Sequence, residues 1–164
     1  MKYILFLIIV LSTIAAKAND TTKAKLYNPL ANAAKDIEAA VAKAKTENKH
    51  VLIQAGGNWC TWCIRFNNYA TMDRQIDSVL TTNYIVYHLN YSPENLNKTI
   101  FAKYEYPERF GFPVFIILDG SGKRIHTQNS AYLEAVKTYD KNKIMEFLQQ
   151  WSPQALDPQS YNRK

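Results

Sequence analysis

The apolar positions along this chain follow two spacings, one typical of helices and one typical of strands. Across residues 31–48, small and aliphatic residues recur every three or four positions between lysines and glutamates, which predicts an amphipathic helix. The same spacing predicts helices over residues 60–74, with a short continuation over 77–82, and over residues 95–104 and 141–151. Asp140 directly precedes the last helix and is a suitable N-cap.

Short apolar runs without helical spacing predict the strands. Residues 51–55 and 84–89 are two such runs, and residues 114–118 are apolar throughout, which is typical of a central buried strand. Gly56 and Gly57 end the first strand. The sequence Asp-Gly-Ser-Gly at 119–122 predicts a hairpin into an antiparallel edge strand over residues 123–128. Helices and strands alternate, so we expect a single α/β domain over residues 31–151.

The two ends of the chain differ from this domain. Lys2 gives a short basic start, residues 4–11 are apolar and uncharged, and Ala16-Lys17-Ala18 is a small-x-small site. These features are typical of a signal peptide over residues 1–18, so we expect an exported protein, periplasmic or secreted. The apolar run is short for a bilayer core of about 30 Å, although an uncleaved anchor is the alternative. Residues 19–30 form a lead-in, and residues 152–164 are expected to be a flexible tail.

The charge of the chain argues against one class of partner. The formal net charge is +6, and loss of the predicted signal peptide removes two lysines and lowers it to +4. The basic residues are spread along the chain without a basic block between aromatic residues, so we expect no nucleic-acid partner. The chain is long enough to bury a core without disulfides.

Both cysteines of the chain lie in the stretch Trp-Cys-Thr-Trp-Cys at 59–63, directly after the first strand. A purely structural disulfide between Cys60 and Cys63 would close a very small loop and constrain little of the unfolded chain. A zinc site needs four ligands, and the three histidines are far apart in sequence, beside or within predicted strands. We therefore favour a redox couple that needs no metal and no cofactor.

The order of these elements resembles the thioredoxin-like superfamily, in particular the exported thioredoxin-like proteins of bacteria. The resemblance rests on Trp59-Cys60-x-x-Cys63 after a strand, on Gly111-Phe112-Pro113 before an apolar strand, and on the hairpin and closing helix that follow. It covers residues 30–151. It implies a thioredoxin fold, in which helices flank a central mixed β-sheet.

The resemblance also implies roles for individual residues. Cys60, at the start of a helix, is the expected nucleophile, because free N–H groups and the helix dipole favour its thiolate. Cys63, one turn inside the helix, is the expected resolving cysteine. The Phe112-Pro113 bond is expected to be cis, in a loop beside the sulfurs where the Phe112 backbone could pair with substrate. Trp59 and Trp62 are expected to form an apolar rim.

The chain departs from the thioredoxin pattern at two places. Gln54 stands where thioredoxins have a buried aspartate that helps to take the proton of the resolving cysteine, and an amide cannot accept that proton at ordinary pH. Thr61-Trp62 replaces the usual Gly-Pro between the cysteines. Neither the reduction potential nor the substrate preference is therefore implied by the resemblance.

These observations together predict an exported thiol–disulfide oxidoreductase, a reductase or isomerase of protein disulfides. Its expected partners are exported proteins with disulfides or thiols and a redox partner that regenerates the couple, and we expect a monomer. The alternative is a non-catalytic binding module that holds a partner through the Pro113 loop and the aromatic rim.

Overall fold

The computed structural model describes residues 25–162, so the predicted signal peptide and the first residues of the lead-in lie outside the described residues. The elements in chain order are α1 Ala33–Glu47, β1 His50–Gly56, α2 Thr61–Met72, α3 Arg74–Asn83, β2 Tyr84–Asn90, α4 Lys98–Lys103, β3 Val114–Leu118, β4 Arg124–Asn129, α5 Lys141–Gln150 and α6 Pro153–Leu156. None of the helices within residues 25–162 has the length and apolar character needed to span a membrane.

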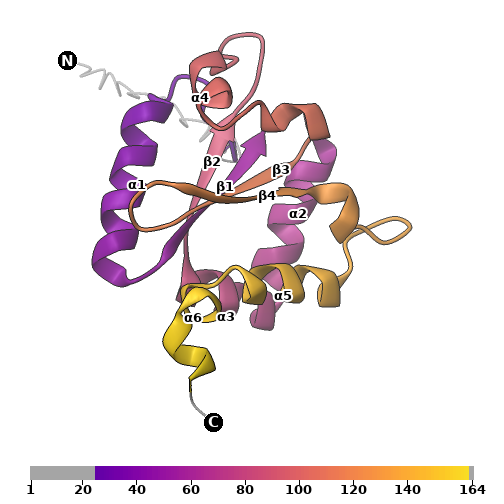
Figure 1. The fold of residues 1–164 in the computed structure, drawn as a ribbon. Coiled ribbons are helices and arrows are strands. Elements are labelled where there is room, and N and C mark those ends of the chain that lie inside the picture. The colour runs from indigo at the N-terminus through magenta and orange to yellow at the C-terminus, as the bar shows by residue number, and fades with distance from the viewer. Residues whose placement is uncertain (1–24, 163–164) are drawn as a thin grey trace, which may run out of the picture.

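The four strands form one mixed sheet in the order β2-β1-β3-β4 (Figure 1). Strands β1 and β2 are parallel, whereas β3 pairs antiparallel with both β1 and β4. The predictions of a buried interior strand at 114–118 and of an antiparallel edge strand after the hairpin are both confirmed. Every residue of β1 and β3 is buried, because each of these strands has a neighbour on both sides and helices over both faces.

Helices cover both faces of the sheet, which gives three layers (Figure 1). Alternate residues of β1 point to opposite faces, so Val51 and Ile53 pack with α1 and α4, whereas Leu52 packs with α2, α3 and α5. The α1 helix contributes Ala33, Ile37, Ala40 and Ala44, the apolar positions of the predicted amphipathic stripe. The predicted thioredoxin-like α/β fold, a central mixed sheet flanked by helices, is confirmed.

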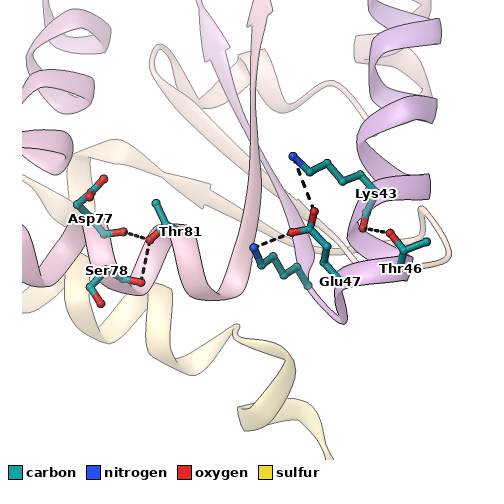
Figure 2. Close-up of polar contacts among 7 residues, drawn as sticks. Lys43, Thr46, Glu47, Asp77, Ser78 and Thr81 are labelled. Carbon is teal, nitrogen blue, oxygen red and sulfur yellow. Dashed lines mark hydrogen bonds and ion pairs between the residues drawn. The ribbon is translucent and has the colours of Figure 1, made fainter.

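Polar side chains line the exposed surfaces of these helices. Figure 2 shows two examples: Thr46 Oγ1 donates to the Lys43 carbonyl oxygen at 2.8 Å, and Thr81 Oγ1 donates to that of Asp77 at 2.8 Å. Glu47 pairs with Lys43 at 3.8 Å near the end of α1. These contacts lie at the surface and leave the buried face of each helix entirely apolar.

The helix predicted over 60–74 with a short continuation is in fact two helices, α2 and α3, separated at Asp73. Asp73 has an extended backbone, with φ −86° and ψ 112°, and its carboxylate accepts from the N–H groups of Gln75 and Ile76 at 3.0 and 3.2 Å. This cap satisfies the free N–H groups that begin α3, so the chain ends one helix and starts another at a single residue.

The tail over residues 152–164, predicted to be flexible, contains two short helical segments. Ser152 caps α6, and Asp157 caps a 3-10 turn over Pro158–Tyr161, with a proline directly after each cap. Proline is favoured at the first helical position because its fixed φ suits the helix and its missing N–H would have no partner there. The Ser-Pro and Asp-Pro pairs that indicated a tail are therefore helix-start signals.

Candidate active site

The two cysteines lie where β1 ends and α2 begins, as the sequence predicts. They form a disulfide, with their Cα atoms 5.2 Å apart. Cys60 is the N-cap of α2 and Cys63 lies in its first turn, so the Cys63 backbone N–H donates to Cys60 Sγ at 3.1 Å. Cys60 is 5% exposed and Cys63 is fully buried. Both cysteines are thus buried, but of the two only Cys60 retains some exposed surface, as an attacking sulfur needs.

The start of α2 is also suited to hold a negative charge on Cys60. The first N–H groups of a helix lack partners within the helix and carry its partial positive charge. One of these groups already points at Cys60 Sγ. When the disulfide is reduced, the same N–H would stabilise a Cys60 thiolate. The predicted roles of nucleophile and resolving cysteine are consistent with this geometry and stay predictions.

Two glycines at the end of β1 provide the space for this arrangement, a role that the sequence did not reveal. A Cβ at Gly56 would lie 2.4 Å from Cys63 Sγ, and a Cβ at Gly57 would lie 2.3 Å from Trp59 Nε1. Neither contact is sterically possible. The Gly-Gly pair that ends the strand therefore lets one sulfur and one indole pack directly against the backbone.

Behind Cys63 lies a polar pair that joins two distant parts of the chain. The Gln54 side-chain amide donates to the Cys63 carbonyl oxygen at 3.0 Å and to the Tyr27 hydroxyl at 2.7 Å. Gln54 thus occupies the predicted position beside the resolving cysteine. Tyr27, from the lead-in, is fully buried and packs with both cysteines, a position that nothing in the sequence around it predicts.

The lead-in is fixed to the active-site loop by its backbone. The Tyr27 N–H donates to Asn58 Oδ1 at 3.1 Å, and Asn58 Nδ2 donates to the Tyr27 carbonyl oxygen at 2.7 Å. The Tyr27 ring also meets the ring of His88, on β2, edge to face at 5.6 Å. Burial lowers the pKa of His88 to about 4, so this imidazole is uncharged at neutral pH.

The loop before β3 lies against the disulfide. The Phe112-Pro113 peptide bond is cis, so that prediction is confirmed. Pro113 is buried, and Phe112 is half-buried and packs against the cluster formed by Tyr27 and the two cysteines. The Phe112 ring also meets the Trp59 indole edge to face at 5.6 Å.

Of the two tryptophans predicted to form the rim, only Trp59 is exposed. Its side chain is 56% exposed, and its indole N–H donates to the Tyr91 carbonyl oxygen at 2.7 Å, which fixes its orientation. Trp62 is half-buried between the Tyr139 ring, at 5.4 Å, and the Arg65 guanidinium, at 4.5 Å. Trp62 thus contributes mainly to packing and only in part to a rim.

Two surface hollows are each lined in part by residues next to Cys60 in the sequence. One, of about 350 Å³, has an entirely apolar surface and is lined by Trp59, Tyr91, Ser92, Pro93 and Leu96. The other, of about 570 Å³, is lined by Asn58, Thr61, Ile64, Arg65, Asn68, Tyr69 and Met72. A polypeptide that crosses the cysteines would therefore meet an apolar surface beside Trp59 and a mixed surface beside Thr61.

The three histidines lie in three different strands. The His50 ring contacts the Trp151 carbonyl oxygen at 2.9 Å, and the His126 ring stacks on the Trp151 indole at 4.1 Å. Within residues 25–162 no three metal-ligand side chains gather at one place. These two histidines hold the end of α5 against the sheet.

Comparisons with known proteins agree with the fold. The profile of the thioredoxin-like family matches residues 32–120. No curated protein matches the chain significantly by sequence. Among solved structures, the chain is similar to a disulphide isomerase from Xylella fastidiosa Temecula1, with a TM-score of 0.69 and 20% identity over 78% of this chain and 97% of that chain.

Two further solved structures are similar at lower scores. The oxidised C-terminal domain of DsbD from Neisseria meningitidis has a TM-score of 0.53 and 17% identity, over 73% of this chain and 96% of that domain. A thioredoxin from Thermus thermophilus has a TM-score of 0.51 and 18% identity, over 69% of this chain and 81% of that chain. At these identities the similarity concerns the fold.

Proposed function

Because the chain belongs to the thioredoxin-like family, we propose that it is a thiol–disulfide oxidoreductase, a reductase or isomerase of protein disulfides, with Cys60 and Cys63 as its redox couple. The single observation that carries the proposal is the position of the disulfide. Cys60 begins α2 with a helix N–H on its sulfur, and Cys63 lies behind it without exposure to solvent. A couple in this position has one sulfur at the start of the helix to attack and one fully shielded sulfur to resolve.

The reaction runs in two exchanges when the protein is reduced. The Cys60 thiolate attacks one sulfur of a substrate disulfide, which breaks that bond and releases the first substrate sulfur as a thiolate. The Cys63 thiolate then attacks Cys60 Sγ and releases the second substrate sulfur. The substrate gains two electrons, and the protein is left with the Cys60–Cys63 disulfide seen here. A dithiol partner must then reduce this disulfide for another cycle.

The surface around Cys60 supports a polypeptide as the substrate. The apolar hollow beside Trp59 could take an apolar side chain close to the substrate disulfide. The loop of Phe112 and Pro113 lies next to the sulfurs and offers the backbone of Phe112 for pairing with an extended segment. The substrates that fit this surface are proteins with accessible disulfides.

The proposal includes export, since the first 18 residues have the features of a signal peptide and disulfide exchange suits an oxidising compartment. Substrates and the regenerating partner would then also be exported proteins. Mass spectrometry of the chain from the periplasm or medium should give an N-terminus near Asn19. A chain found intact from Met1 in the membrane fraction would contradict this part of the proposal.

Reduction of insulin by dithiothreitol tests the activity. Wild-type protein should accelerate the reaction, and Cys60→Ser should reduce the rate to that of dithiothreitol alone, since no sulfur remains to attack. Equal rates for the two proteins would favour the alternative, a binding module in which the cysteines take no part. A matched pair of variants tests the roles: Cys63→Ala should accumulate mixed disulfides with substrate, whereas Cys60→Ala should not.

A further inference from the structure

We propose that the Tyr27 hydroxyl donates a hydrogen bond to Cys63 Sγ when the disulfide opens, and thereby stabilises the Cys63 thiolate that resolves the mixed disulfide. The proposal rests on the proposed function for its catalytic meaning, although the hydrogen bond itself can be tested without any substrate. It assigns a positioning role to a residue of the lead-in, which lies outside the family match at 32–120.

The geometry begins at Gly56. Cys63 Sγ and the Tyr27 hydroxyl oxygen both lie in the space beside Gly56 that a side chain would fill, at 2.4 and 2.9 Å from the position of a Cβ. The two atoms are therefore close neighbours across the same glycine. Tyr27, Cys60 and Cys63 form one buried cluster.

The Tyr27 hydroxyl has a hydrogen to donate. A phenol carries one O–H donor and accepts through its lone pairs. Here the oxygen accepts from Gln54 Nε2, and no hydrogen bond among residues 25–162 uses its own hydrogen. In the disulfide, Cys63 Sγ is uncharged and a weak acceptor. Once the disulfide opens and Cys63 loses its proton, the sulfur becomes the strongest acceptor near this hydroxyl.

The other titratable groups around Cys63 do not supply this hydrogen bond. His88, on β2, lies beside Gln54 in the register of β1 and β2 and meets the Tyr27 ring edge to face, and it is uncharged, because burial lowers its pKa to about 4. Tyr139 donates to the Trp62 carbonyl oxygen, and the Arg65 guanidinium lies over the Trp62 ring. Within residues 25–162 no carboxylate hydrogen-bonds to Gln54, Tyr27 or His88.

Tyr27 stays protonated in this position, since burial raises the pKa of its phenol above the ordinary value. It can therefore donate a hydrogen but cannot act as a base. Gln54 is likewise unable to take a proton. The pair of Tyr27 and Gln54 thus differs from a buried carboxylate, because it stabilises the Cys63 thiolate but does not accept the proton. Water, or the departing substrate thiolate, removes the proton of Cys63.

Contacts at both ends hold the hydroxyl in place. Asn58 makes two hydrogen bonds with the Tyr27 backbone, and Gln54 binds the hydroxyl while also donating to the Cys63 carbonyl oxygen. The donor is thus fixed before the thiolate forms, so little conformational entropy is lost when the new hydrogen bond is made.

The titration of Cys63 tests the proposal directly. In a Cys60→Ser background, Cys63 is the only thiol, and its deprotonation is followed by ¹³C NMR of labelled cysteine. Addition of Tyr27→Phe should raise the midpoint by roughly one to two pH units, the effect of losing a hydrogen bond to a charged group. Tyr84→Phe is the matched control, because it deletes another buried hydroxyl, one that donates to the Leu148 carbonyl oxygen at 2.6 Å.

A midpoint that shifts equally in the Tyr27→Phe and Tyr84→Phe proteins would overturn the proposal. If Tyr27→Phe does not fold, Asn58→Ala in the same background frees the Tyr27 backbone, and an unchanged midpoint there would equally overturn it. In the two-cysteine protein, Tyr27→Phe should slow release of the mixed disulfide about tenfold or more at neutral pH and leave the first attack unchanged. Failure of insulin reduction by wild-type protein would remove the proposed function without affecting the titration result.

Discussion

At the scale of single residues, the active site depends on the absence of side chains as much as on their presence. Gly56 and Gly57 lie where a Cβ would overlap Cys63 Sγ and the Trp59 indole, respectively. The sulfur is held by its disulfide and the indole by its hydrogen bond to Tyr91, so neither can move aside easily. Close packing of this kind makes even one added methyl group costly.

We expect Gly56→Ala to destabilise the protein by about 1–3 kcal/mol, the usual effect of overpacking. The added methyl group would displace Cys63, so formation of the Cys60–Cys63 disulfide should also be impaired. Gly120→Ala is the control, because its Cβ would meet Lys45 only at ordinary contact distance, 3.5 Å. Urea unfolding measures the loss of stability, and titration of free thiols after oxidation measures how much of the disulfide has formed. Equal urea unfolding midpoints for the two variants would contradict the prediction and show that the Cys63 side chain can move aside.

At the scale of elements, Asp73 separates α2 from α3 and joins them to α5. Its carboxylate caps α3 and pairs with Lys141 Nζ, at the start of α5, at 2.7 Å. The hydrogen bond from Lys141 is the main reason that the pKa of Asp73 lies below its ordinary value, and the backbone N–H groups add to it. Its carboxylate therefore fixes the starts of α3 and α5, and its backbone N–H ends α2 by donating to the Tyr69 carbonyl oxygen.

The depressed pKa of Asp73 predicts a pH dependence of stability. A carboxylate with a lower pKa in the folded state stabilises the protein above its unfolded pKa, and this stabilisation is lost as the pH falls through the folded value, below about pH 4. Lys141→Met should therefore lower stability at neutral pH and flatten the decline in acid. Lys137→Met, which removes an exposed lysine, should keep the wild-type decline. Urea unfolding midpoints measured from pH 7 to pH 3 test this expectation. Identical curves of midpoint against pH for the two variants would contradict it.

The elements also show what the sequence can and cannot predict. The spacing of apolar residues predicted β1, β2, β3, α1 and α5 closely, because those residues form the core, and the Asp-Gly-Ser-Gly turn predicted β4. The break at Asp73 was missed, since one capping carboxylate outweighs an otherwise continuous helical pattern. The end of the chain was misread because a proline after a serine or aspartate can begin a helix as well as a tail.

At the scale of the whole molecule, the cysteines and the cis-proline loop could be predicted because each is a local pattern beside a strand. The role of Tyr27 could not, because it depends on contacts with Gln54 and Asn58, which are 27 and 31 residues away in sequence. Nothing in the sequence around Tyr27 indicates a buried residue. The lead-in becomes part of the active site only when the fold brings it behind Cys63.

The lead-in should therefore be needed for both stability and the protection of Cys63. A chain that begins at Asn32 keeps the whole family match but loses the fully buried Tyr27 and the hydrogen bond from Asn95 to the Pro29 carbonyl oxygen. We expect its free energy of unfolding to fall by about 3–5 kcal/mol, as for the loss of a large buried aromatic side chain.

Alkylation gives the second measurement of this prediction. In a Cys60→Ser background, removal of the lead-in should expose Cys63 and increase its rate of reaction with iodoacetamide. A chain that begins at Asn19 and ends at Trp151 is the control, because it lacks α6 but keeps Tyr27. Its Cys63 should react as slowly as in the chain from Asn19 to Lys164. If the chain from Asn32 also reacted slowly, α2 and the sheet alone would shield the resolving sulfur, and the lead-in would contribute to stability only.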